Sequence, residues 1–242
     1  MLSQLSSAAM GVVEFFLPRI CHICLERLAP GDEVICDRCR SQLLPVEGPV
    51  CPRCGYGPAR IEEGRCPACP KPAHFDMARG AVRFGDTSRD LIHELKFYGH
   101  VELGPVMARR CFRLLEEEWA FEAPDMIVPV PLHESRRRER GFNQAEEIGA
   151  ELERLARVPM APAALERIRP TRVQSTLSRA ERRENVRGAF YCDPSSGVAG
   201  RTVLLLDDVM TSSATVNECS RVLKDAGAAR VLVLVFARAG GG

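Results

Sequence analysis

The sequence contains no run of 18 apolar residues, which excludes a membrane-spanning helix. It is poor in aromatic residues, with one Trp and three Tyr in 242 residues. It therefore lacks the regularly spaced rings on which the bases of single-stranded nucleic acid stack. No charge of one sign predominates, since the net charge is +1, and the overall charge identifies no partner.

The N-terminal stretch MLSQLSSAAMGVVEFFLPRI lacks the basic first part of a secretory signal peptide, and Glu14 interrupts its apolar residues. We therefore expect residues 1–19 to form a short amphipathic leader helix and the protein to be cytoplasmic.

Cysteine, in contrast, is plentiful: eight of the 11 cysteines form four C-x2-C pairs. The stretches CHICLERLAPGDEVICDRC and CPRCGYGPARIEEGRCPAC share the pattern C-x2-C-x11-C-x2-C, and an offset of 30 residues makes them an internal repeat. The three other cysteines stand singly and are expected to be buried packing residues: Cys111, Cys192 and Cys219.

Each set of four thiolates can complete a tetrahedral zinc site, and the repeat predicts two zinc ribbons. One ion is expected on Cys21, Cys24, Cys36 and Cys39, and the other on Cys51, Cys54, Cys66 and Cys69. The alternatives are disulfides or redox C-x2-C motifs, but a redox motif begins a helix and would have to occur here four times. Because all four positions are thiolates, both ions should be structural and supply folding free energy. The sequence leaves open whether the ribbons contact nucleic acid, protein or only the second domain.

The stretch PKPAH ends the double ribbon, expected over residues 20–74, and strand and helix patterns alternate over residues 75–242. MIVPVPL, TVLLLD and RVLVLVFA are continuously apolar, whereas NQAEEIGAELERLAR and ATVNECSRVLKDAGA carry apolar residues at helical spacing. This pattern predicts an α/β fold whose parallel sheet is flanked by helices. Ligands of such sheets bind beyond the carboxyl ends of the strands.

The stretch VLLLDDVMTSSAT, residues 203–215, follows a buried strand with two adjacent carboxylates, Asp207 and Asp208. These repel each other and require a positive partner or a hydrogen-bond donor. The hydroxyl-rich turn into the next helix can hold an anion on its backbone N–H groups. A sugar phosphate with vicinal hydroxyls satisfies both the carboxylates and the turn. The alternative is an ordinary helix cap with both aspartates in solvent.

Arginines are concentrated in two stretches that flank the strand ends, HESRRRERGFNQ and LERIRPTRVQSTLSRAERRENVR. The planar guanidinium suits phosphate, so Arg140 and either Arg179 or Arg182 are predicted to bind phosphate rather than to lie on a solvated charged face. The second stretch contains Pro170 and many hydroxyls, and it is predicted to be a mobile loop that closes over substrate.

These residues carry a family resemblance. VLLLDDVMTSSAT closely resembles the phosphoribosyl pyrophosphate (PRPP) motif of type I phosphoribosyltransferases. VPVPLHESRRRERGFNQAE and RVQSTLSRAERRENVRGAF resemble the ComF/GntX branch of that family, which also carries an N-terminal zinc ribbon. The resemblance spans nearly the whole chain.

The resemblance implies a type I phosphoribosyltransferase fold, a five-stranded parallel sheet with a small hood. Asp207 and Asp208 would hold the ribose hydroxyls, and Lys96 would face the active site. The loop after VPVPL would hold pyrophosphate and Mg²⁺. The 5′-phosphate would be surrounded by Met210, Thr211, Ser212, Ser213, Ala214 and Thr215.

The chain departs from the family pattern at two positions. The family usually has Gly at the position of Ser213, where it permits a positive φ. The 6-oxopurine branch has Asp at the position of Thr211, which acts on N7 of the base, so hypoxanthine and guanine are not expected as acceptors.

Two functions are compatible with these features. One is a Mg²⁺-dependent phosphoribosyltransferase that displaces pyrophosphate from PRPP with an unidentified nitrogen acceptor. The other is a non-catalytic factor that binds PRPP or single-stranded DNA, alone or with competence proteins. The resemblance links ComF members to DNA uptake in natural competence.

Overall fold

A computed structural model describes residues 18–57, 66, 68–119, 123–172 and 178–240 of the chain. The predicted leader, residues 1–19, lies outside the described residues except for its last two positions. Within the described ranges, no helix combines the length and the apolar composition that crossing a membrane requires.

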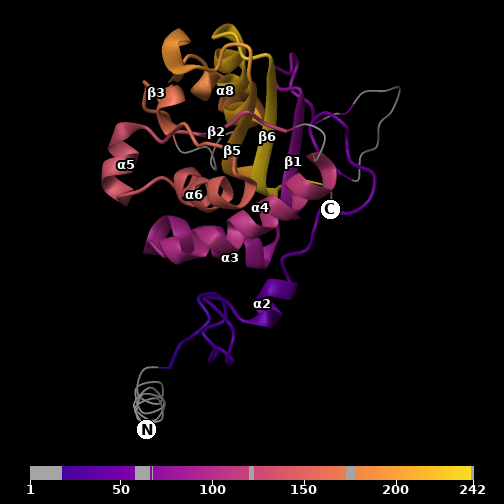
Figure 1. Cartoon of the computed structure of the whole chain (residues 1–242), viewed down its shortest axis with the longest axis vertical. Helices are drawn as coiled ribbons and strands as arrows, with labels where there is room; N and C mark the ends of the chain where they lie inside the picture. The colour runs from indigo at the N-terminus through magenta and orange to yellow at the C-terminus, as the bar shows by residue number, and fades with distance from the viewer. Residues whose placement is uncertain (1–17, 58–65, 67, 120–122, 173–177, 241–242) are drawn as a thin grey trace.

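The centre of the molecule is a parallel sheet in the strand order β1–β6–β5–β2 (Figure 1). Its strands are β1 (Met77–Arg83), β2 (Met126–Pro129), β5 (Thr202–Met210) and β6 (Arg230–Arg238). The expected α/β architecture is therefore confirmed. The apolar patterns predicted three of the strands, and β1 was not predicted.

The resemblance implied five strands, whereas the described residues build a sheet of four. The segment between α6 and β5 pairs with itself, because β3 (Glu166–Arg167) and β4 (Phe190–Tyr191) form a separate antiparallel sheet. With α7 (Arg179–Val186), this unit packs against α8 (Ala214–Asp225), and we identify it with the small hood.

Helices cover both faces of the sheet (Figure 1). One face packs against α4 (Gly104–Trp119) and α6 (Gln144–Ala156), and the other packs against α8. Between β1 and α4 the chain forms α3 (Asp86–His93), the π-helical turn η1 (Glu94–Tyr98) and the 3₁₀ turn η2 (Val101–Leu103).

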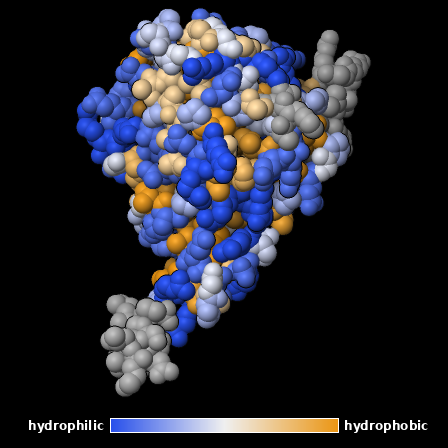
Figure 2. Space-filling view, in the orientation of Figure 1, coloured by the Kyte–Doolittle hydropathy of each residue, from blue (hydrophilic) through white to orange (hydrophobic). Residues whose placement is uncertain are grey.

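The alternation of side chains along the strands separates two apolar cores. Leu204 and Leu206 of β5 lie in the core beneath α4 and α6, whereas Val203 and Leu205 lie in the core beneath α8. Burial on both faces explains why residues 203–206 of β5 and 231–237 of β6 are apolar at every position. The outer surface is mostly hydrophilic on the face that Figure 2 shows, with apolar residues emerging between polar ones.

The two ribbons join opposite cores. Cys21, Cys36 and Cys39 of the first ribbon, which contains α2 (Asp37–Ser41), are buried with residues of α3 and α4. Cys54 and Cys66 of the second ribbon are buried with the residues beneath α8. Each ribbon therefore extends a core of the α/β unit instead of standing apart from it.

Candidate functional site

Strand β5 carries both aspartates and continues beyond them to Met210, whereas the sequence pattern placed them after the strand. Pairing with β6 extends that far, with Asp207 opposite Val235 and Met210 opposite Arg238. The two carboxyl groups still interact, because the charge of Asp208 raises the pKa of the Asp207 carboxyl. The adjacent charges therefore need a positive partner.

Asp208 is paired with the predicted lysine. Its side chain is almost fully buried, and its carboxylate forms an ion pair with the ammonium group of Lys96 on η1. Burying a carboxylate is unfavourable without such a partner. The pair brings η1 to the carboxyl end of β5, although more than 100 residues separate the two in sequence.

Asp207 faces the loop that follows β5. Its Oδ1 accepts a hydrogen bond of 2.9 Å from the backbone N–H of Asp208. Burial raises the pKa of the Asp207 carboxyl well above its usual range, the neighbouring Asp208 charge raises it further, and Lys96 opposes both effects. A carboxyl in this state is suited to a hydroxyl or cation partner supplied by a ligand.

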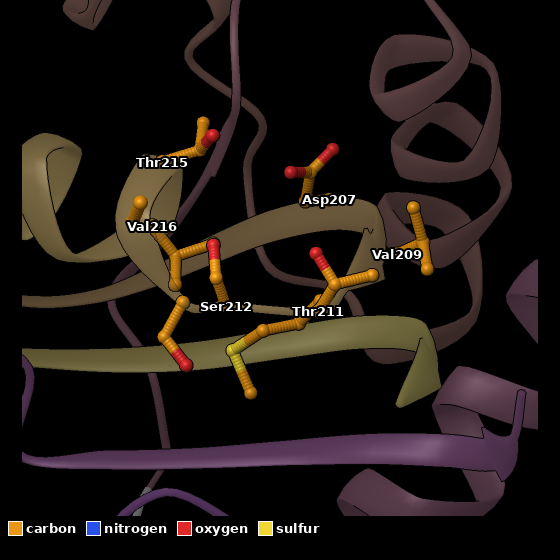
Figure 3. A pocket seen from close by; sticks show the side chains of 9 residues that line it. Asp207, Val209, Thr211, Ser212, Thr215 and Val216 are labelled. Carbon is orange, nitrogen blue, oxygen red and sulfur yellow. The ribbon is translucent and has the colours of Figure 1, made fainter. Parts of the chain in front are cut away.

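The loop from β5 into α8 forms a small cavity of about 30 Å³. In Figure 3, the side chains of Asp207, Thr211, Ser212 and Thr215 stand on the same side of this loop. The N-terminus of α8 closes the cavity, and a helix N-terminus directs backbone N–H groups toward such a site. Its lining consists of Asp207, Val209, Met210, Thr211, Ser212, Ser213, Ala214, Thr215 and Val216.

Ser213 is the N-cap residue of α8 and adopts a left-handed conformation, with φ 59°. Positive φ is the geometry that the family's glycine at this position permits. The Ser213 side chain is buried, and its hydroxyl has no hydrogen-bond partner among the described residues. Two features at Ser213 are therefore unfavourable for stability, its left-handed backbone conformation and its unsatisfied buried hydroxyl.

Arg238 holds the same loop in place through hydrogen bonds. This side chain is fully buried at the end of β6, and its Nη1 donates to the carbonyl oxygens of Met210, at 2.9 Å, and Thr211, at 3.0 Å. Its Nε donates to the carbonyl oxygen of Cys54, at 3.3 Å. Burial lowers the pKa of Arg238, and the nearby Cys54 raises it. One guanidinium thus joins the second ribbon to the loop.

A larger cleft of about 600 Å³ opens beside the loop, within the size range of small-molecule sites. Both aspartates line it, together with the sequence-predicted Lys96, Arg140 and Arg182. Its apolar and aromatic wall contains Phe84, Ile92, His93, Phe97, Val130, Pro131, Leu132 and Val209.

The cleft arginines occupy distinct environments. Arg182 on α7 donates from Nη1 to the Thr211 hydroxyl, at 3.1 Å. Arg140 lies over the Phe97 ring, 5.8 Å from its centroid, and its Nη1 is buried with no hydrogen-bond partner among the described residues. Burial lowers the pKa of Arg140, while the charge of Asp208 raises it. The Arg179 side chain lies outside the described residues.

The stretch after VPVPL is a helix rather than the expected loop, because α5 spans Glu134–Arg140. Pairs one helical turn apart stabilise it, including Arg136 with Glu139 and Arg138 with Glu134. Arg137 forms two hydrogen bonds with Glu146. These exposed arginines behave as a solvated charged face, and Arg140 at the end of α5 is the one that lines the cleft.

The second arginine stretch also contains regular secondary structure, namely β3 and α7. The prediction of a mobile loop is therefore wrong for the residues of α7. Residues 173–177 of the stretch lie outside the described residues. Ser178 and Glu181 form a capping box at the start of α7. This S-x-x-E signal is visible in the sequence and could have identified the helix.

Sequence reasoning also missed several residues that line the cleft. Arg167 of β3 lines it and lies over the Phe190 ring, and burial lowers the pKa of this arginine. Phe84 and His93 line the apolar wall. No sequence signal separates these residues from ordinary surface positions, because only the fold brings their elements together.

The eight ribbon cysteines assemble in the predicted sets. The four sulfur atoms of each set lie within 4.8 Å of one another. The Sγ atoms of Cys54 and Cys66 are 3.6 Å apart, as are those of Cys51 and Cys69. A disulfide requires about 2 Å, whereas a tetrahedral zinc ion with bonds of about 2.3 Å separates its sulfurs by about 3.8 Å. The two clusters are consistent with two structural zinc sites.

Comparison with known proteins agrees with this organisation. Residues 12–70 match the family described as double zinc ribbon domain. Competence protein F of Haemophilus influenzae is 33% identical over 153 residues, which cover 62% of this chain and 67% of that protein. DNA utilization protein YhgH of Escherichia coli K12 is 36% identical over 153 residues, covering 61% and 66%.

Among solved structures, glutamine PRPP amidotransferase from B. subtilis superposes with a TM-score of 0.40 and 18% sequence identity. The match covers 60% of this chain and 30% of that enzyme. The chain thus spans about two thirds of the length of the curated relatives that it matches.

Proposed function

This chain belongs to the ComF family of competence and DNA utilization proteins, and on that premise we propose that it binds PRPP with Mg²⁺ and transfers the phosphoribosyl group to a nitrogen acceptor. The observation that carries the proposal is the convergence of two carboxylates, a hydroxyl-rich helix N-terminus and four arginines on one cleft. A phosphorylated sugar with vicinal hydroxyls requires all three kinds of group.

The loop before α8 binds the phosphate end of the ligand, and the aspartates of strand β5 bind its ribose. The backbone N–H groups at the start of α8 and the hydroxyls of Thr211, Ser212 and Thr215 bind the 5′-phosphate. Asp207 accepts hydrogen bonds from ribose hydroxyls, which its position beside the loop favours. Asp208 has the same role, oriented by its ion pair with Lys96.

The pyrophosphate lies toward the guanidinium groups of the cleft. Arg140 offers a buried, unsatisfied N–H, and Arg167 and Arg182 approach from the hood. Carboxylate oxygens are ligands that Mg²⁺ prefers, and the two aspartates in the cleft fit an ion that enters with PRPP. Mg²⁺ supplies positive charge that stabilises the leaving pyrophosphate.

The acceptor occupies the apolar side of the cleft. Phe84, Phe97 and His93 form a wall suited to a planar ring, and the His93 and Phe97 rings are 4.7 Å apart. Attack of an acceptor nitrogen on the anomeric carbon displaces pyrophosphate through an oxocarbenium-like transition state, and the arginines take up the developing charge.

The direct test is pyrophosphate release from PRPP in the presence of Mg²⁺, measured across a panel of nitrogenous bases and nucleic acids. The proposal expects release with at least one acceptor and its loss in Arg140→Gln. Arg201→Gln is the matched control, because Arg201 is exposed and lies before β5, away from the cleft. PRPP that binds but yields no pyrophosphate with any acceptor contradicts transfer.

A second function, binding of PRPP or single-stranded DNA without turnover, is favoured by a separate observation. Phe97, Tyr98 and Phe142 line a pocket of about 280 Å³ together with Arg136 and Arg140. Exposed rings beside arginines can stack bases and bind the backbone. This grouping comes from the fold, because the sequence shows no regular aromatic spacing. The relatives named for competence and DNA utilization agree with it.

If DNA binds in this pocket, DNA and PRPP should compete for Arg140, which lines both the pocket and the cleft. Affinity for single-stranded DNA should fall steeply with salt, because bound counterions are released. PRPP should displace the DNA, and Phe97→Ala should weaken DNA binding more than PRPP binding. A low-salt titration that detects no DNA complex removes this function and leaves the transferase proposal unaffected.

A further inference from the structure

A group of histidine and glutamate side chains belongs neither to the two sets of four cysteines nor to the residues that line the cleft. His22 sits between the first two zinc-ligand cysteines, whereas His100 and Glu102 lie at η2 of the α/β unit. His22 Nε2 is 3.3 Å from Glu102 Oε1, and His100 Nδ1 is 3.1 Å from the same oxygen. The two imidazole rings are 4.1 Å apart, centroid to centroid.

These separations match shared coordination of one ion. A tetrahedral metal with bonds of about 2.0 Å to nitrogen and oxygen places its ligand atoms about 3.3 Å apart. One ligand atom of each of these three residues lies within 4.8 Å of the others. A ribbon contact held only by hydrogen bonds does not require two imidazoles to converge on one carboxylate oxygen.

The second ring nitrogen of His100 lies near a carboxylate, as is common for a histidine that binds a metal. His100 Nε2 lies 3.6 Å from Glu94 Oε2 on η1. Histidines bound to metals commonly direct their second nitrogen toward a carboxylate, which fixes the ring orientation and makes the ligating nitrogen more basic. Glu94 thus supplies an outer carboxylate in addition to the three ligand atoms.

We propose that His22, His100 and Glu102 form a third metal site, which takes a divalent transition metal such as Zn²⁺ and fastens the first ribbon to the α/β unit. Two imidazoles and one carboxylate suit zinc, cobalt or nickel better than magnesium or calcium. Water completes the coordination, since the three side chains are partly exposed, at 21%, 34% and 43%.

The exposed site differs from the cysteine clusters in how it holds its ion. The cysteine sets are closed and mostly buried, and their ions should resist chelators. The site of His22, His100 and Glu102 has three protein ligands open to solvent, so its ion should exchange. Because the ligands come from segments about 80 residues apart, binding should stabilise the docked arrangement.

The test uses full-length protein that has been dialysed against a chelator and retains two zinc ions. Calorimetric titration with Zn²⁺ should show a third ion in the wild type, and the same Zn²⁺ should raise the thermal unfolding midpoint. His100→Ala should lose both effects, and Glu102→Gln should weaken the third site at least tenfold. Both variants should keep the two chelator-resistant ions.

His74→Ala is the matched control, because His74 is a partly buried histidine outside the cluster, and this variant should bind the third ion as the wild type does. If His100→Ala fails to fold, the near-isosteric Glu102→Gln gives the answer alone. No third ion in the wild type at millimolar Zn²⁺ overturns the proposal. Equal uptake by wild type, His100→Ala and Glu102→Gln also overturns it.

Discussion

The Nη1 atom of Arg238 lies 2.9 Å from the carbonyl oxygen of Met210, so the last residue of β6 holds the last residue of β5 from inside the protein. The same guanidinium donates to Cys54 in the second ribbon. A fully buried cation is stable only with partners of this kind. The loop that follows Met210 is therefore positioned by the ribbon as well as by the sheet.

Replacing Arg238 with Gln should disturb this loop. The substitution leaves the carbonyl oxygens of Thr211 and Cys54 without their donor, whereas Met210 keeps its hydrogen bond from the Ala239 N–H. Each buried unsatisfied group costs about 1–3 kcal/mol. We expect the free energy of unfolding to fall by about 2 kcal/mol or more in urea titrations, and PRPP affinity to fall in calorimetry. The exposed Arg201→Gln should change neither, and unchanged PRPP affinity in folded Arg238→Gln contradicts the supporting role.

The ion pair between Asp208 and Lys96 should show strong coupling. Asp208→Asn leaves the ammonium group without its partner in a largely buried setting and should destabilise the protein by about 2 kcal/mol. Lys96→Met should be similarly harmful. The double variant should recover much of this loss, because neither charge remains. A double-mutant cycle in urea measures the coupling, and additive effects of the two changes contradict it.

Asp207 predicts a pH dependence. Its raised pKa means that the native state holds this proton to a higher pH than the unfolded chain does. The free energy of unfolding should therefore fall as pH rises from the ordinary aspartate range toward the raised pKa. PRPP affinity should rise over the same window, because the ribose hydroxyls require the carboxylate as acceptor. In Asp207→Asn, neither the free energy of unfolding nor the PRPP affinity should show this pH dependence. If the variant shows the same pH dependence as the wild type, its assignment to Asp207 is refuted.

Ser213→Gly should stabilise the unliganded protein by about 1 kcal/mol, because it relieves the left-handed conformation and removes an unsatisfied buried hydroxyl. Ser212→Gly is the matched control, since Ser212 is absent from the positive-φ residues and gains no such relief. Chemical unfolding reports both. Lower stability of Ser213→Gly indicates that the serine hydroxyl has a structural partner.

Much of the architecture was predictable because it depends on local patterns. Residues 203–206 of β5 and 231–237 of β6 are apolar at every position, α8 ends just before Gly227, and the cysteine repeat identifies both ribbons. Strand β1 was not predicted, because its sequence MARGAVR mixes polar and apolar residues. Its partner β6 and the second ribbon bury it, and neither effect is visible locally.

The candidate site was predictable where one continuous motif supplies it, from Asp207 to Thr215. Residues brought in from other segments were harder to identify. Arg167 belongs to a stretch of seven arginines with no feature that distinguishes it, and only the pairing of β3 with β4 turns it toward the cleft. Arg238 was missed because an arginine at a chain end usually lies in solvent, whereas here it is fully buried.

Calorimetric titration of PRPP with Mg²⁺ into the full chain tests the central claim most directly. We predict saturable binding that weakens by at least tenfold in Asp207→Asn, since losing a hydrogen bond to a charged acceptor costs about 2 kcal/mol. Asp193→Asn replaces an exposed aspartate that is not among the residues lining the cleft, and this variant should bind as the wild type does. Absence of binding to the wild type, or equal affinity in all three proteins, contradicts a PRPP site at the end of β5.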